Sequence, residues 1–194
     1  DADSAAVQAA AQVVNAGGIA VMPLETVYCA MARVDHTQAL ADLRRLRSLP
    51  ADKPIALHVA DAKSAEQYID PPSPYQHYLM SRLWPGPVGM VFAVSREKRE
   101  EVTARLAVAE HDVYDAGQIT IRCPAHAVAR KVVGACPHPL AAVPAADGAL
   151  DVGALPQELL NKVEIVLDDG PVRHGRPSTI IRAGERDFQI VRQG

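Results

Sequence analysis

Short apolar runs alternate with amphipathic segments along this chain, and that order constrains the fold more than any other feature of the sequence. A helix is predicted over residues 4–16, because Ser4 can act as its N-cap and Gly17-Gly18 as its C-terminal stop. Further helices are predicted over residues 37–48, 75–83, 125–133 and 155–160. Strands are predicted over residues 19–22, 55–59, 88–94, 119–122, 163–167, 178–181 and 188–191, with one more inside residues 137–153. Strands separated by helices early and paired strands late indicate a mixed α/β sheet with helices on its faces.

The length and charge of the chain bound its domain organisation and its partners. With 194 residues the chain can bury a sizeable core, and a single domain over residues 1–194 is predicted. Its 20 lysine and arginine residues are outnumbered by 23 aspartate and glutamate residues, which gives a formal net charge of -3. This balance argues against a protein that coats nucleic acid through bulk charge, so a polyanionic partner has to meet a local basic patch.

Cysteine and histidine usage argues against a metal or disulfide framework. The three cysteines are odd in number and form no C-x-x-C pair, which indicates reduced thiols in a cytoplasmic protein. The seven histidines are scattered, so no structural metal is predicted. The most apolar N-terminal stretch, AAVQAAAQVV at residues 5–14, contains two glutamines and has no basic flank, so neither a membrane span nor a signal core is predicted.

A concentration of positive charge precedes the strand predicted at residues 55–59. Residues 43–54 read LRRLRSLPADKP, with three arginines at helical spacing followed by Lys53, whose backbone is restricted by Pro54. Two interpretations are open from the residues alone: a solvated helix face, which is the commoner meaning of a charge run, and an anion-binding site. Arg122 at the end of one strand and Ser178 at the start of another favour the second, because open α/β sheets collect ligands at strand ends.

Five segments, in the same order along the chain, resemble the Sua5/YciO/YrdC/YwlC family, whose well-studied members are threonylcarbamoyl-AMP synthases. The first, GGIAVMPLETVYCA at residues 17–30, is similar to the family's opening motif, G-G-hydrophobic-Y-P-T-D-T-V-Y-G-L. The others are Asp52-Lys53-Pro54 leading to Leu57-His58-Val59, Trp84-Pro85-Gly86-Pro87, Ile121-Arg122-Cys123-Pro124, and Gly175-Arg176-Pro177-Ser178-Thr179 with the terminal Arg192-Gln193-Gly194. The resemblance covers residues 17–194.

The resemblance implies the YrdC-like fold, an open twisted α/β sheet with helices on its faces and a deep basic cavity. It also implies a reaction in which threonine, bicarbonate and ATP, accompanied by Mg²⁺, form threonylcarbamoyl-AMP and pyrophosphate. That product is the donor for the tRNA modification t6A. Because the resemblance ends where the family's catalytic domain ends, we expect the short form of the family, without an additional C-terminal domain.

The resemblance also assigns expected roles to eight residues. The expected catalytic cations, which offset charge that develops at the α-phosphorus, are Arg47, Lys53 and Arg122. The expected nucleotide-binding residues are Lys53, Arg122, Ser178 and Arg192. The expected substrate-binding residues are Thr26, Tyr28 and His58. The alternative interpretations are a solvated surface charge for the lysine and the terminal arginine, a strand cap for the serine, and core packing for the last group.

The sequence departs from the synthases most clearly at two places, and Glu25 also replaces the aspartate of the T-D-T motif. The synthases carry K-x-R-P ahead of the lysine, and the matching residues here, Arg47-Ser48-Leu49-Pro50, replace the arginine by Leu49, which cannot bind an anion. Where the synthases carry S-A-N, the serine and asparagine positions fall on Pro144 and Ala146. Loss of one preorganised donor typically lowers a rate by about 10²- to 10³-fold, so a changed amine substrate or reduced activity is expected. Both departures resemble the YciO-type branch.

A second hypothesis is a catalytically impaired YciO-type paralogue that binds nucleotide, double-stranded RNA or tRNA. Its basis is a set of cations: Arg44, Arg45, Arg47, Lys53, Arg122, Arg130 and Lys131. Aromatic residues make up only 4% of the chain, so base stacking is disfavoured and the shape of duplex RNA or tRNA is the expected target. The affinity for RNA is then expected to fall steeply with salt.

Overall fold

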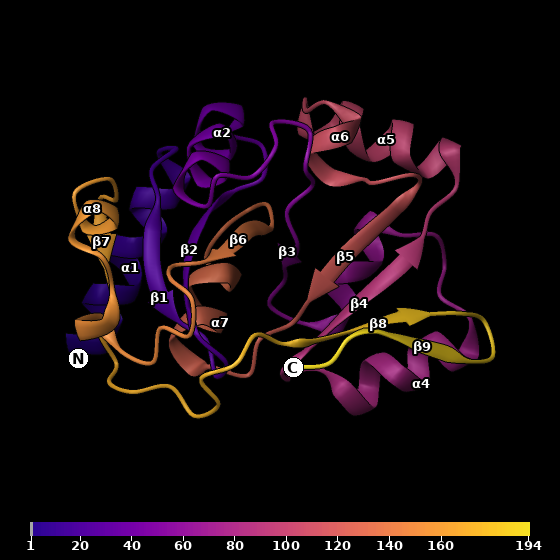
Figure 1. The fold of residues 1–194 in the computed structure, drawn as a ribbon. Helices are drawn as coiled ribbons and strands as arrows, with labels where there is room; N and C mark the ends of the chain where they lie inside the picture. Colours follow the sequence, from indigo (N-terminus) through magenta and orange to yellow (C-terminus); the bar gives the residue numbers. More distant parts are fainter. Residues whose placement is uncertain (1) are drawn as a thin grey trace.

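The computed structural model describes residues 2–194, which form one nine-stranded mixed sheet with helices on its faces (Figure 1). The strands are β1 (Ala20–Pro23), β2 (Tyr28–Arg33), β3 (Leu57–His58), β4 (Val88–Ala93), β5 (Gln118–Arg122), β6 (Leu140–Pro144), β7 (Ile165–Val166), β8 (Thr179–Ala183) and β9 (Phe188–Arg192). They lie in the order β7-β1-β2-β6-β3-β5-β4-β8-β9. The pairs β1–β7, β3–β5 and β4–β8 are parallel and the other neighbours are antiparallel. The predicted mixed α/β sheet is therefore confirmed.

All the predicted helices are present, with boundaries that shift by a few residues. The helices are α1 (Ala2–Asn15), α2 (Thr37–Leu46), α3 (Ala62–Ala65), α4 (Pro74–Leu83), α5 (Arg96–Leu106), α6 (Glu110–Val113), α7 (Ala127–Gly134) and α8 (Gln157–Leu160), with 3₁₀ turns η1 (Glu66–Tyr68) and η2 (Val152–Ala154). Because α1 begins at Ala2, Ser4 lies inside the helix and the predicted N-cap is wrong. The predicted stop is confirmed, since Gly17 has a φ of 89° and the Gly18 amide donates to the Val13 carbonyl at 2.9 Å. Within residues 2–194 no helix is long and apolar enough to cross a membrane.

Four elements, β2 and the helices α3, α5 and α6, are missing from the sequence prediction. Tyr28 was expected to bind substrate, but residues 28–33 form β2, in which every residue except Arg33 is buried. A strand that is buried on both faces shows no polar alternation, so its pattern gives a weak signal. Helix α5 lacks a periodic apolar pattern. Its sequence REKREEVTARL is mostly charged, and only Val102 and Leu106 are buried.

The strands bury two separate layers of side chains on the two faces of the sheet. Successive residues of β1 and β2 contribute alternately to one layer or the other, as the two-residue period of a strand requires. The first layer lies against α2, α4 and α5, and the second lies against α1 and α7. Helices α1 and α7 contact β1 and β2, so they cover only one end of their face.

The middle of that same face carries small or polar side chains instead of a covering helix. His58 of β3 and Gly89 of β4 both pair with Arg122 of β5, and Gly89 also pairs with Ile180 of β8. Residues that are direct partners in a sheet share a face, so these side chains line one uncovered surface. This surface is the floor of the cavity described below.

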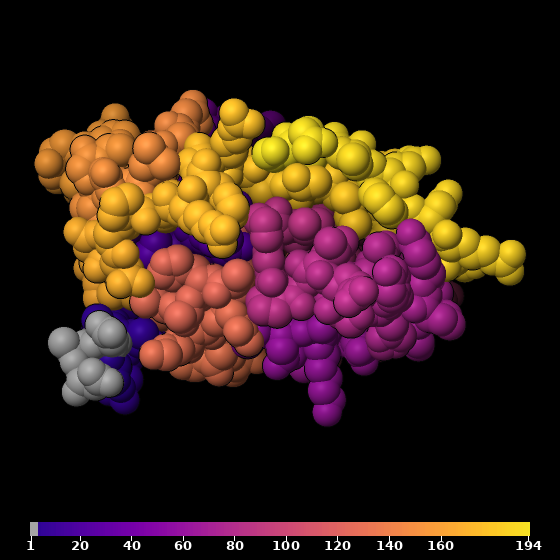
Figure 2. Space-filling model, turned by 90° about the horizontal axis from the view of Figure 1, so that it is seen from below, coloured from indigo at the N-terminus to yellow at the C-terminus, as the bar shows by residue number. Residues whose placement is uncertain are grey.

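The C-terminal hairpin of β8 and β9 completes one side of the cavity. Its register contains a bulge, because Ile181 pairs with Ile190 whereas Ile180 pairs with Arg192, which leaves Val191 as an extra residue. The bulge sets Arg192 opposite Ile180, and both residues line the cavity. The tip of the hairpin projects from one end of the molecule, as seen from two directions in Figures 1 and 2.

Candidate active site

Three adjoining chambers form one cavity over the uncovered part of the sheet. The inner chamber, of about 130 Å³, is lined by residues that include Thr26, His58, Arg122, Ser178 and Arg192. The outer chamber, of about 390 Å³, shares the residues Ala56, Thr120, Ile180 and Arg192 with the inner chamber and adds Lys53, Asp115, Gln118 and Arg182. The loop chamber, of about 380 Å³, shares Thr26, Pro177 and Ser178 with it and adds His174, Arg176 and Gly194. The cavity brings together segments from almost the whole length of the chain.

Arg122 lies on the floor of the inner chamber and is 4% exposed. Its Nη2 donates to Glu25 Oε1 at 2.7 Å, its Nη1 donates to Thr26 Oγ1 at 3.0 Å, and its Nε donates to the Gly86 carbonyl at 3.3 Å. These contacts fix the plane of the guanidinium. A buried charge held in this way is preorganised for an anion that approaches from the cavity.

The carboxylate of Glu25 pairs with Arg122 on the side away from the inner chamber. Its second carboxylate oxygen, Oε2, accepts from the backbone amides of Ala125 at 3.0 Å and His126 at 3.3 Å. Both amides lie just before α7, where the helix dipole favours negative charge. Glu25 and Arg122 therefore form a buried ion pair.

His58 lines the inner chamber beside Arg122 and is 4% exposed. Burial and the nearby positive charge of Arg122 lower the pKa of His58 to about 3. Its Nδ1 lies 3.3 Å from the Ala56 carbonyl, which can only accept, so the neutral ring carries its proton on Nδ1 and leaves Nε2 as an acceptor. A neutral His58 suits a hydrogen bond from a substrate N–H or O–H group.

Burial of His58 makes the stability of the folded state depend on pH. Because the pKa of His58 is about 3 when folded and near 6.5 when unfolded, the unfolded chain binds the extra proton between these values and stability falls as the pH drops below 6.5. At pH 5 the loss from this residue is about 2 kcal/mol. We expect His58→Asn to flatten this part of the pH profile of unfolding in urea. An unchanged slope in the variant would contradict the account.

Thr26 and Tyr28 were both expected to bind substrate, but their side chains lie in different places. Thr26 lines the inner and loop chambers and accepts from Arg122. Tyr28 is fully buried, and its hydroxyl donates to the Gly170 carbonyl at 2.8 Å. Among the described residues, Tyr28 and Arg47 line none of the three chambers. The contacts of Tyr28 are those of the packing alternative.

Ser178 and Arg192 form the rim between the chambers. Arg192 donates through Nε and Nη2 to the Ser178 carbonyl at 3.1 and 2.8 Å, so the end of β9 is tied to the start of β8. Partial burial and the nearby Arg122 lower the pKa of Arg192. Two guanidinium groups that repel each other across one chamber create a strong preference for an anion between them.

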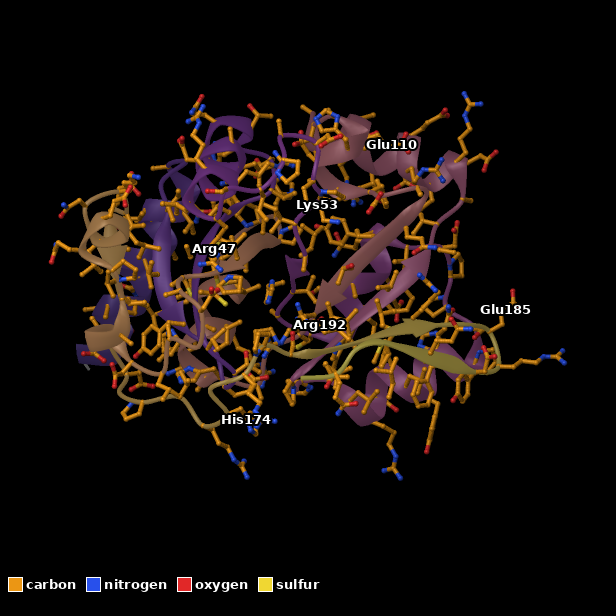
Figure 3. The ribbon with its side chains drawn as sticks, viewed as in Figure 1. Arg47, Lys53, Glu110, His174, Glu185 and Arg192 are labelled. Atoms are coloured by element: carbon orange, nitrogen blue, oxygen red, sulfur yellow. The ribbon has the colours of Figure 1, made fainter. Side chains whose placement is uncertain are left out.

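The other two expected catalytic cations each carry a carboxylate partner. Lys53 lines the outer chamber with its Nζ 3.8 Å from Asp115 Oδ2. Arg47, at the end of α2, forms an ion pair with Asp147, whose side chain is 92% exposed. Figure 3 shows Arg47, Lys53 and Arg192 around the centre of the molecule, whereas Glu110 and Glu185 lie toward its periphery. Exposed ion pairs are weak, so a polyphosphate can compete for both cations.

The residues at the two clearest departures from the synthases pack against the hydrophobic core or line the inner chamber. Leu49 packs against the hydrophobic core, so it supplies no charge to the cavity. Pro144 lines the inner chamber, and Ala146 packs against the core. Cys29 also lines this chamber, where burial raises the pKa of its thiol to about 12, so it stays neutral at pH 7.

Sequence reasoning missed several residues of the cavity, among them Thr120, Asp115, Gln118, Arg182 and His174. A signal for two of them was present in β5. Gln118, Thr120 and Arg122 alternate with the buried Ile119 and Ile121, so they share the face of Arg122.

Comparison with known proteins agrees with this geometry. The family profile Sua5_yciO_yrdC, described as "Telomere recombination", matches residues 12–194. The chain belongs to the Sua5/YciO/YrdC family. The predicted family and the predicted YrdC-like fold are therefore confirmed.

Two curated members of the Sua5/YciO/YrdC family illustrate the extent of the similarity. The threonylcarbamoyl-AMP synthase of Pyrococcus abyssi is 27% identical over 193 residues, which cover 97% of this chain and 54% of that protein. The threonylcarbamoyl-AMP synthase of Bacillus subtilis is 25% identical, with 95% and 52% coverage. The chain thus spans about half the length of the curated relatives it matches.

Solved structures of family members show the same architecture. P. abyssi Sua5 complexed with L-threonine has a TM-score of 0.81 and 25% identity, and the match covers 96% of this chain and 53% of that one. Escherichia coli YciO has a TM-score of 0.77 at 19% identity, with 99% and 90% coverage, which is a likeness of fold.

Proposed function

We propose that this chain catalyses the formation of a carbamoyl-adenylate in its cavity, the reaction type of threonylcarbamoyl-AMP synthases, with L-threonine as the first candidate amine. The observation that carries the proposal is the convergence of Thr26, His58, Arg122, Ser178 and Arg192 in the inner chamber. The name of the P. abyssi relative and its complex with threonine support the choice of reaction and amine. The adenylate would serve as the donor for the t6A modification of tRNA.

The proposed reaction has two bond-forming steps. The neutral amine attacks bicarbonate, forming a C–N bond with loss of water, and the product is a carbamate. A carbamate oxygen then attacks the α-phosphorus of ATP, the bond from that phosphorus to the bridging oxygen breaks, and pyrophosphate leaves. Both steps depend on holding charged reactants together, which is where a rigid cavity contributes most.

The roles of the side chains follow from their positions and charges. Arg122 and Arg192 would offset the negative charge that grows around the α-phosphorus, and Ser178 at the same rim would bind a phosphate oxygen. Lys53 would bind the outer phosphates in the adjoining chamber, with Mg²⁺ entering as the partner of ATP. Arg47 would join the phosphate site by exchanging Asp147 for a phosphate oxygen. His58 would accept a hydrogen bond from the amine or its carbamate.

The direct test is product formation with ATP, Mg²⁺, bicarbonate and a panel of amino acids that includes threonine, analysed by chromatography and mass spectrometry. We expect an AMP adduct of one amino acid together with equimolar pyrophosphate. Lys53→Ala should lower the yield, whereas Lys162→Ala, which removes a lysine paired with Glu158 outside the cavity, should leave it unchanged. Absence of an adduct with every amine would contradict the proposed reaction.

The alternative function, binding of double-stranded RNA or tRNA, receives less support from the charges. Five of the seven cations in the set that motivates it have a carboxylate partner: Arg44, Arg45, Arg47, Lys53 and Arg122. Arg44 and Arg122 are also buried, so they present no surface charge to a duplex. RNA binding that falls steeply with salt would restore this alternative.

A further inference from the structure

We propose that Asp115 is the side chain of this protein that binds the divalent cation accompanying the polyphosphate in the outer chamber. The inference rests on the proposed function and adds a residue to the same site. Asp115 lines the outer chamber together with three cationic side chains, Lys53, Arg182 and Arg192. It is the one carboxylate among the residues that line the three chambers in the described part of the chain.

A carboxylate is out of place among three cations if the chamber binds only anionic oxygens. Without a metal, the negative charge of Asp115 repels a phosphate chain. It also pairs with Lys53, whose Nζ lies 3.8 Å away, and so competes with phosphate for that cation. With a metal, the same charge becomes favourable, because Mg²⁺ is usually bound by one or two carboxylates plus the phosphates of the substrate. A lone aspartate beside phosphate-binding cations is therefore the donor set expected for a metal that arrives with its nucleotide.

Asp115 is placed by a rigid turn. Its amide donates to the Gln118 carbonyl at 2.8 Å and its carbonyl accepts from the Gln118 amide at 2.9 Å. The two residues between them, Ala116 and Gly117, have φ angles of 47° and 76°, the left-handed pair that closes a two-residue hairpin. Such a turn fixes the start of the Asp115 side chain relative to β5, the strand that also carries Arg122.

The carboxylate also keeps room for a ligand. Its side chain is 67% exposed, and its ion pair with Lys53 is long at 3.8 Å, so little free energy is lost when Lys53 moves to a phosphate. Gln118 and Thr120 line the same chamber and add neutral oxygens nearby. The residues present thus fit a hard cation that keeps most of its water and phosphate ligands.

The test is calorimetric titration of ATP into the protein, once with Mg²⁺ and once with EDTA. For the natural sequence we expect binding to be about tenfold tighter with Mg²⁺. In Asp115→Asn this metal enhancement should disappear, while binding of metal-free ATP should stay equal or become tighter because Lys53 is released. Glu185→Gln, an identical change of charge at the hairpin tip, should behave like the natural sequence.

The outcomes of this titration distinguish failure of the inference about Asp115 from failure of the proposed function. If Asp115→Asn tightens ATP binding equally with and without Mg²⁺, Asp115 only restrains Lys53 and the inference is wrong, although the proposed function stands. If the natural sequence binds no ATP in either buffer, the inference and the proposed function both fail. A second readout is the electron paramagnetic resonance spectrum of Mn²⁺–ATP. We expect it to change on binding to the natural protein, and to differ for the protein-bound complex in Asp115→Asn.

Discussion

Replacement of Arg122 by glutamine is expected to lower the free energy of unfolding by about 3–5 kcal/mol, because it leaves the buried Glu25 carboxylate without its counter-charge. Only 2.7 Å separates Nη2 of Arg122 from Oε1 of Glu25, and both side chains are almost fully removed from water. The two backbone amides that bind the other oxygen of Glu25 cannot replace a full positive charge. Urea unfolding at pH 7 measures the loss.

The double variant Glu25→Gln with Arg122→Gln separates the ion pair from the fold. Removal of both charges avoids the uncompensated carboxylate, so the double variant should regain a large part of the lost stability. Both the single and the double variant should bind ATP weakly, since each lacks the Arg122 guanidinium that lines the inner chamber. If the single and double variants were equally destabilised, the ion pair would not be the cause.

Replacement of Arg192 by alanine is expected to lower kcat/KM for ATP by about 10²- to 10³-fold, the usual loss when one preorganised donor to the reacting phosphate is removed. Arg192 lies where the inner and outer chambers meet, so its guanidinium can reach phosphates in both. Arg192→Lys should recover only part of the rate, because an ammonium cannot bind two oxygens in the fork geometry of arginine.

A matched control exists in the same hairpin. Arg186 lies at the exposed tip of β8–β9, away from the cavity, so Arg186→Ala should leave kcat/KM within twofold of the natural value. Thermal unfolding of Arg186→Ala should change little, since that side chain is exposed, whereas Arg192→Ala also removes two hydrogen bonds to the Ser178 carbonyl and should lower Tm slightly. A similar loss of rate in both variants would mean that the hairpin, rather than the guanidinium of Arg192, sets the activity.

The sequence predicts the fold well where pattern and burial agree. Three apolar runs next to glycine or proline form strands as predicted, near residues 19–22, 88–94 and 119–122. The helix stop at Gly17-Gly18 is also present. The strand predicted over residues 55–59 shortens to Leu57–His58, although the backbones of Ala56 and Val59 still hydrogen-bond to Ala142 and Arg122 of the neighbouring strands. Central β2 was missed because its two faces are equally apolar.

The candidate site was predictable only in part, because the sequence does not show which carboxylate pairs with each cation. Lys53, Arg122, Ser178, Arg192, Thr26 and His58 all line the cavity. The pattern of cations, however, does not reveal that Arg47 pairs with Asp147, one hundred residues later, or that Lys53 faces Asp115. Such pairs depend on the order of strands in the sheet, which brings β3, β5 and the loop after β6 together.

The most direct test of the central claim is exchange of labelled pyrophosphate into ATP in the presence of Mg²⁺. A carbamoyl-adenylate mechanism is reversible at the α-phosphorus, so label should enter ATP only when bicarbonate and the correct amino acid are both present. We predict this double dependence for the natural protein and its loss in Arg192→Ala. Exchange that proceeds without bicarbonate, or no exchange with any amino acid, would contradict the assignment of this cavity as the site of carbamoyl-adenylate formation.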